Sequence, residues 1–163
     1  MSPYSQPQSS YDPATIAAEL HTTLADGLRL FAGVDEALSG VREKPDGWCA
    51  REIVGHLIDS ACNNHRRWIV GQTPGFEKFD GYEQNAWVSR QRYADESWSD
   101  LVGLWAAYNR HLRYVISKTP ADHLLMSATA PDGSGSVTLG FLMKDYVGHI
   151  QHHLEQVRRV TGL

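Results

Sequence analysis

The residues of this chain best suited to chemistry are its histidines, of which there are eight among 163 residues. His149 and His153 are four positions apart, so on a helix their side chains point about 40° apart and lie one turn from each other. Two imidazoles at this spacing can bind one metal ion. The pair continues the apolar stripe of Leu142 and Tyr146, where burying a polar ring without a partner costs about 1–3 kcal/mol. A shared metal ion removes this cost, so we predict that both histidines are metal ligands.

A third ligand is predicted on another helix. His56 lies at the edge of the apolar stripe marked by Ile53 and Leu57, whereas His65 points to the opposite side of the same helix. A lone inward histidine is more often a hydrogen-bonded core residue, so the assignment of His56 depends on the other two ligands. Three histidine ligands leave one tetrahedral position open, which is the pattern of a catalytic rather than a structural zinc site.

Two carboxylates are candidate catalytic residues. Asp59 comes three positions after His56, and Asp145 comes four positions before His149. Either carboxylate could accept the second N–H of a ligating imidazole and orient the ring, or act as a base on metal-bound water. The alternative for each is an ordinary carboxylate on a helix surface.

Three further residues are predicted to support the metal site or to contact substrate. His152 is displaced from the two ligands beside it and is expected at the rim of the site. Gln156 follows His153 by one turn, and Asn63 follows His56 by one heptad on the same face. A buried Asn needs hydrogen-bond partners, so Asn63 is expected to line the cavity.

Four stretches of the chain have the apolar periodicity of helices, and each is about 30 Å long when helical, as in ordinary four-helix bundles. The predicted helices span residues 13–38, 50–70, 98–118 and 138–161. We therefore predict an all-α four-helix bundle. The link between its second and third helices is long and rich in aromatic residues (71–96), with a short helix near 82–91. The turn-rich segment 119–137 is expected to form a short hairpin.

The composition fits one domain over residues 13–163, preceded by a polar tail over residues 1–12 that is expected to fray. Fifteen basic against nineteen acidic residues give a net charge of −4, which argues against a nucleic-acid binder. No apolar run approaches the roughly 18 residues of a membrane span, and no signal peptide is recognisable, so a cytoplasmic protein is expected. Cys49 and Cys62 are too few for a disulfide framework and are expected to be reduced.

Two segments of the chain resemble the DinB/YfiT-like family, namely residues 48–59 (WCAREIVGHLID) and residues 148–156 (GHIQHHLEQ). The resemblance extends over residues 13–161, with Cys49 standing where the family often has Ser. It implies a four-helix bundle with a three-histidine site at His56, His149 and His153. It also implies a divalent metal ion, commonly zinc or nickel, and frequently a homodimer. Characterised relatives include transferases that use thiols such as mycothiol or bacillithiol, and a thiol-dependent isomerase.

These observations favour a metal-dependent enzyme that acts on a small molecule. The reaction is expected to be S-transfer with a low-molecular-weight thiol, or hydrolysis. Such a thiol would be a diffusible cosubstrate, because neither Cys49 nor Cys62 is expected at the site. One alternative is a non-catalytic stress-response protein that binds a metal or a small molecule. Another is an interaction module that uses the aromatic link over residues 71–96.

Overall fold

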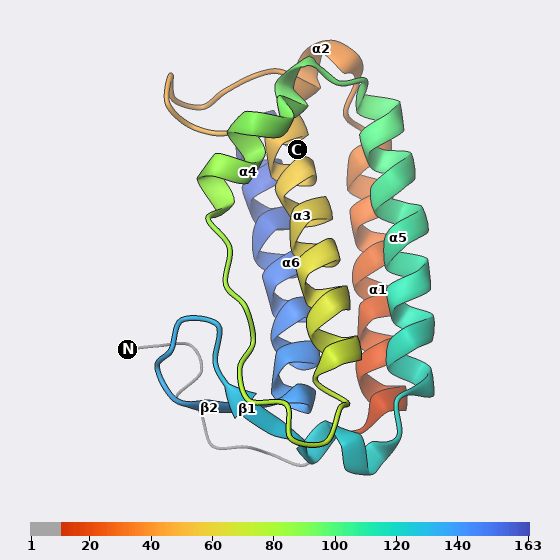
Figure 1. The fold of residues 1–163 in the computed structure, drawn as a ribbon. Coiled ribbons are helices and arrows are strands. Elements are labelled where there is room, and N and C mark those ends of the chain that lie inside the picture. Colours follow the sequence, from red (N-terminus) through yellow and green to blue (C-terminus); the bar gives the residue numbers. More distant parts are fainter. Residues whose placement is uncertain (1–10) are drawn as a thin grey trace.

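The computed structural model describes residues 11–163 and is built around four long helices that lie side by side (Figure 1). Helix α1 packs against α5 and α6, and α3 packs against the same two helices. This arrangement confirms the predicted all-α four-helix bundle. The helices and strands are α1 (Pro13–Ala32), α2 (Glu36–Ser39), α3 (Ala50–Val70), α4 (Gln84–Gln91), α5 (Trp98–Lys118), β1 (Ser127–Thr129), β2 (Ser136–Thr138) and α6 (Leu139–Thr161). Short 3-10 turns cover Tyr93–Asp95 and Ala121–Leu125.

Three of the long helices begin at side chains that cap the backbone. Asp12 accepts a hydrogen bond of 2.7 Å from the backbone N–H of Thr15, directly before Pro13 at the first position of α1. Ser97 and Thr138 cap α5 and α6 in the same way. These residues satisfy N–H groups that a helix leaves unpaired at its start, so the sequence itself sets where the helices begin.

The prediction of one helix over residues 13–38 was wrong, because this stretch forms α1 and α2. The backbone N–H of Gly33 donates to the carbonyls of Leu30 and Phe31, and α1 ends there. Asp35 then caps α2 by accepting a hydrogen bond of 2.7 Å from the backbone N–H of Leu38. A helix stop and a new cap therefore lie inside a stretch whose apolar periodicity is continuous.

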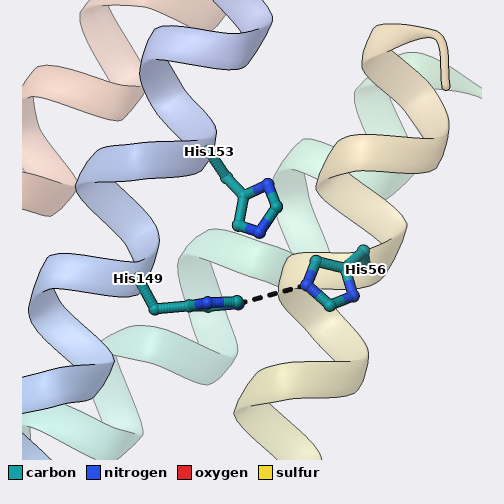
Figure 2. Close-up of side chains that lie close together, drawn as sticks. All are labelled: His56, His149 and His153. Atoms are coloured by element: carbon teal, nitrogen blue, oxygen red, sulfur yellow. Dashed lines mark hydrogen bonds between the residues drawn. The ribbon is translucent and has the colours of Figure 1, made fainter. Parts of the chain in front are cut away.

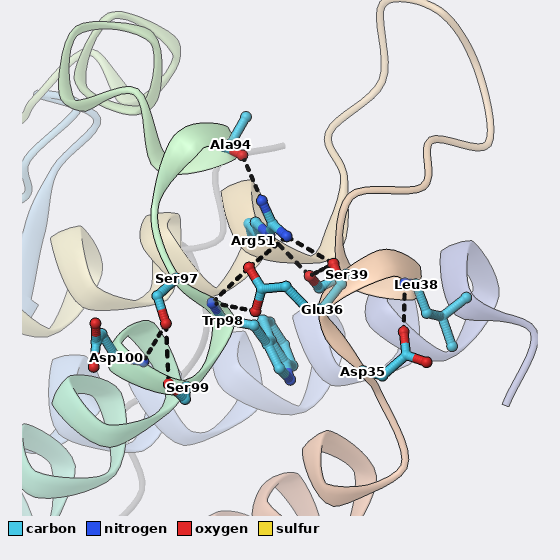
Figure 3. Close-up of polar contacts among 10 residues, drawn as sticks. All are labelled: Asp35, Glu36, Leu38, Ser39, Arg51, Ala94, Ser97, Trp98, Ser99 and Asp100. Carbon is cyan, nitrogen blue, oxygen red and sulfur yellow. Dashed lines mark hydrogen bonds and ion pairs between the residues drawn. The ribbon is translucent and has the colours of Figure 1, made fainter.

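A half-buried guanidinium fixes the end of the bundle where α3 begins (Figure 3). Arg51 donates hydrogen bonds to the hydroxyl of Ser39 at 2.8 Å and to the backbone carbonyl of Ala94 at 2.9 Å. It also pairs with the carboxylate of Glu36 at 2.7 Å, and that carboxylate accepts from the backbone N–H of Trp98. Arg51 thus joins α2 and the end of the link to the first turn of α3, and its partner Glu36 adds the start of α5.

The link over residues 71–96 runs along the outside of the bundle and meets the hairpin of β1 and β2. Backbone hydrogen bonds of 3.0 and 2.9 Å join Phe79 and Glu77 to Thr129 of β1. The buried Phe79 packs with Ala128 and Val137 of the hairpin in a small second core. The short helix α4 and the hairpin confirm the two predictions for these segments, and together they cover one side of α3 and α6.

No helix within residues 11–163 is both long enough and apolar enough to cross a membrane. The predicted tail over residues 1–12 lies outside the described residues, apart from Tyr11 and Asp12. Of these two, Tyr11 packs against the main core and Asp12 is the cap of α1.

Candidate metal centre

Three histidines from two helices point toward one another in the space between α3 and α6 (Figure 2). His56 comes from α3, and His149 and His153 come from successive turns of α6. One ring nitrogen of each lies within 4.8 Å of the other two. The Nε2 atoms of His56 and His149 are 3.1 Å apart. The structure therefore brings together the three residues that the sequence predicts as ligands.

The packing of α3 against α6 explains this convergence. His56 is only 1% exposed, and it lies on the same inner face of α3 as the buried Ile53. The indole of Trp48 packs against its ring at a centroid distance of 5.1 Å. His149 and His153 are half-buried, and their rings lie 4.5 Å apart. Apolar packing on both helices thus holds three polar rings against one another.

The three rings are kept neutral by their surroundings. Burial and the neighbouring histidines lower the pKa of His56 to about 4 and that of His149 to about 3. Burial also lowers the pKa of His153. A neutral imidazole has one ring nitrogen with a free lone pair, which is the form that binds a metal ion. The donor set, three neutral nitrogens in close contact, fits a divalent metal such as zinc or nickel.

A cavity of about 320 Å³ opens beside His56 and His149. Helices α3 and α6 form one side of it, and the link and the β1–β2 loop form the other. Much of its wall is polar, including Ser60, Asn64, Arg67, Tyr82, Gln84 and Asp145. A cavity of this size is at the lower end of the range for small-molecule sites. His56 and His149 therefore face a small, polar space.

The two candidate catalytic carboxylates occupy different environments. Asp145 lines the cavity one turn before His149. Partial desolvation raises its pKa, and the charge of Arg67 acts in the opposite direction. Asp59 is 2% exposed and does not line the cavity. Its carboxylate instead accepts hydrogen bonds from Tyr93 at 2.7 Å and from the Gln91 amide at 2.6 Å.

The three residues predicted to support the site also lie in different environments. Gln156 accepts a hydrogen bond of 2.8 Å from Nδ1 of His153. His152 is exposed, with its ring 5.1 Å from that of His153. The amide of Asn63 donates to the backbone carbonyl of Asp59, and Asn63 is not among the residues that line the cavity.

Three cavity residues on α3 were not among the site residues predicted from the sequence. They are Ser60, Asn64 and Arg67, which follow His56 by four, eight and eleven positions. Residues at these spacings share one face of a helix with His56, so the periodicity of α3 was the signal that could have found them. All three are buried and polar, which is the second sign of a functional wall.

The remaining chemistry-bearing residues of α3 lie elsewhere. Nδ1 of His65 is 3.2 Å from the hydroxyl of Tyr108 on α5, and the His65 ring is 5.2 Å from that of His111. Cys62 is exposed and Cys49 is buried at the start of α3, and neither cysteine lines the cavity. The expectation that the protein's own thiols lie outside the site is therefore met.

A family model for the DinB superfamily matches residues 19–157. The chain belongs to the DinB superfamily. This membership confirms the family resemblance of the two histidine-bearing segments. The three clustered histidines of α3 and α6 all lie within the residues that match the family.

This DinB-superfamily chain is 29% identical over 122 residues to a Bacillus subtilis (strain 168) protein named "Putative metal-dependent hydrolase YfiT". The alignment covers 71% of this chain and 65% of YfiT, slightly less than two thirds of that protein. A Bacillus mycoides (strain KBAB4) protein with the same functional name is 24% identical over 129 residues, covering 79% of this chain and 73% of its own length.

Solved structures of other proteins share the DinB-superfamily bundle. YfiT from Bacillus subtilis, described as having an unusual four-helix bundle topology, superposes with a TM-score of 0.82 at 19% identity over 96% of this chain and 93% of its own. A mycothiol-dependent maleylpyruvate isomerase superposes with a TM-score of 0.75 at 13% identity, over 90% of this chain and 60% of its own. At these identities the likeness shows the fold.

Proposed function

We propose that this protein is a metal-dependent enzyme in which His56, His149 and His153 bind one divalent metal ion. The observation that carries the proposal is the close contact of three neutral imidazoles beside a polar cavity of about 320 Å³. Three protein ligands with an adjacent cavity match the pattern of a catalytic site, in which a water or substrate occupies the fourth position. The naming of two relatives as metal-dependent hydrolases supports the same class of activity.

The surrounding residues have distinct parts in this proposal. A bound divalent ion would lower the pKa of a coordinated water or thiol toward neutrality. Asp145, on the cavity wall one turn before His149, is positioned to accept the proton of the reacting group. Asn64 and Tyr82 offer hydrogen-bonding groups to the polar parts of a small substrate.

Two reaction classes fit this arrangement: hydrolysis, and S-transfer or isomerisation with a low-molecular-weight thiol. The names of the relatives support the first class, and the mycothiol-dependent isomerase among the structural neighbours supports the second. In the second class the thiol is a diffusible cosubstrate, because neither Cys49 nor Cys62 lines the cavity. A zinc or nickel ion suits the nitrogen ligands in either case.

Metal titration tests the proposal. Metal-stripped wild-type protein is titrated with Zn²⁺ and with Ni²⁺ in a calorimeter, and we expect one ion per chain. His149→Ala should abolish this binding. His21→Ala is the matched control, since it removes an exposed imidazole of α1 that lies outside the three-histidine cluster and should leave the affinity unchanged. Absence of stoichiometric binding by the wild type, or unchanged binding by His149→Ala, would contradict the proposal.

Cobalt substitution separates the two reaction classes. A thiolate bound to Co²⁺ produces a sulfur-to-metal charge-transfer absorption band. Addition of N-acetylcysteine to the Co²⁺-loaded protein should produce this band if the enzyme uses a thiol cosubstrate. No band at saturating thiol would favour hydrolysis instead.

A further inference from the structure

Two buried polar atoms one turn apart on α3 have no hydrogen-bond partner: Nδ1 of His56 and Oδ2 of Asp59. Within residues 11–163, the only other buried side-chain atoms in this condition are the indole nitrogens of Trp68 and Trp105. An indole N–H can only donate, and Nδ1 of His56 donates when the ring proton is on it, so in that tautomer Oδ2 of Asp59 is the one hydrogen-bond acceptor without a partner in this buried set. Unpaired buried polar atoms are rare in folded proteins and call for an explanation.

The geometry of His56 determines what its second nitrogen must do. Its Nε2 faces the cluster, 3.1 Å from Nε2 of His149 (Figure 2). If Nε2 presents its lone pair to a metal ion, the proton of the neutral ring is on Nδ1. Metal binding therefore fixes a buried N–H donor at Nδ1, and a buried donor without an acceptor costs about 1–3 kcal/mol.

The carboxylate of Asp59 is anchored by one oxygen and unpaired at the other. Its Oδ1 accepts hydrogen bonds from the Tyr93 hydroxyl at 2.7 Å and from the Gln91 amide at 2.6 Å. Both donors come from the C-terminal part of the link, against the side of α3 that carries Gly55 and Asp59. Residues three apart on a helix have Cβ atoms about 5–6 Å apart, a distance that an imidazole and a carboxylate can span by a side-chain rotation or through one water.

We propose that Asp59 is a positioning residue whose Oδ2 accepts the Nδ1–H of His56. This inference rests on the proposed metal site. The hydrogen bond holds His56 in the tautomer that presents Nε2, and the negative charge makes that nitrogen a stronger ligand. On α6 the neutral amide of Gln156 orients His153 in the same way, through a bond to Nδ1 already formed at 2.8 Å, but without adding charge. Tyr93 and Gln91 hold the Asp59 carboxylate and so connect the link to the metal ligands.

Zinc affinity measured by competition with a chromophoric chelator tests the proposal. Asp59→Asn should lower the affinity by about tenfold or more, the usual effect of removing a group that orients a ligand. Asp95→Asn is the matched control, because it removes an exposed carboxylate of the same link and should leave the affinity unchanged. Tyr93→Phe keeps the Asp59 carboxylate but removes one anchor, so it should cause a smaller loss of affinity. This variant also tests the proposal if Asp59→Asn does not fold.

Nitrogen NMR of the zinc-loaded protein gives a readout that a purely structural role would not change. The wild type should show His56 protonated at Nδ1, with a proton that exchanges slowly with solvent. In Asp59→Asn this proton should shift and exchange faster. If Asp59→Asn lowers only the melting temperature, with unchanged zinc affinity and Nδ1–H resonance, the proposal is overturned. If the wild type binds no zinc, the proposed function fails, and this inference fails with it.

Discussion

Gln156 accepts a hydrogen bond of 2.8 Å from Nδ1 of His153, one turn earlier on α6. The amide oxygen has no proton to give, so this bond places the His153 proton on Nδ1 and leaves Nε2 with its lone pair. The ring is thereby set in the tautomer and orientation that a metal ligand needs.

Gln156→Ala should therefore weaken metal binding by about tenfold, because His153 loses the contact that orients it. Chelator competition with Zn²⁺ measures the effect. Glu155→Ala is the matched control, since Glu155 is exposed and pairs only with Arg158 in the described contacts. Equal affinities for the two variants would show that packing alone orients His153.

The metal-free protein should lose stability as the pH falls below about 6.5, the ordinary pKa of histidine. Burial lowers the pKa of His56 to about 4 and that of His149 to about 3 in the folded state. Between these values and 6.5 the unfolded chain binds protons at both rings while the folded protein does not, so acid favours unfolding. From pH 7 to pH 4.5 the free energy of unfolding should fall by about 2 kcal/mol per ring.

Urea unfolding of metal-stripped protein at the two pH values measures this loss. His149→Gln should reduce the pH dependence, because it removes one of the two buried rings. His21→Gln, which removes an exposed histidine on α1, should leave the dependence as it is in the wild type. Equal pH dependence in the His149→Gln variant and the wild type would contradict this assignment.

Gly55→Ala should destabilise the protein by about 1–3 kcal/mol. A methyl group at Gly55 would overlap the ring of Tyr93, so the end of the link could not pack against α3. Gly103→Ala is the matched control, because nothing lies within 4 Å of a methyl group there. That substitution should stabilise α5 by up to about 1 kcal/mol, since alanine favours a helix more than glycine does. Urea unfolding distinguishes the two outcomes by their sign.

Much of the site could be predicted from the sequence because its three histidines follow helical geometry. The spacing of His149 and His153 directly indicates two neighbouring rings on one helix face. His56 could be added because the apolar stripe of α3 places it on the inner side. The four-helix bundle could also be predicted from the sequence, since four long amphipathic stretches have few other ways to bury their apolar faces.

What could not be predicted depends on side-chain direction and on segments without periodicity. Helical angles favoured Asn63 as the cavity residue, but its amide turns back to the carbonyl of Asp59, and Asn64 lines the cavity instead. The path of the link is set by non-local contacts, such as the backbone bond from Phe79 to Thr129, which no local pattern of residues indicates. The partners of Asp59 were hidden for the same reason, because Tyr93 lies 34 residues away.

The cavity is shared between two kinds of structure, and this division affects how such a protein can change over evolution. The histidines are held by α3 and α6, whereas the opposite wall comes from the link and the β1–β2 loop, which meet where Gly81 lies against the Pro131 carbonyl. Loops tolerate substitution and insertion better than the helices of a core do. Related sequences can therefore change the lining of the cavity through these two segments while the three histidines keep their places on the helices.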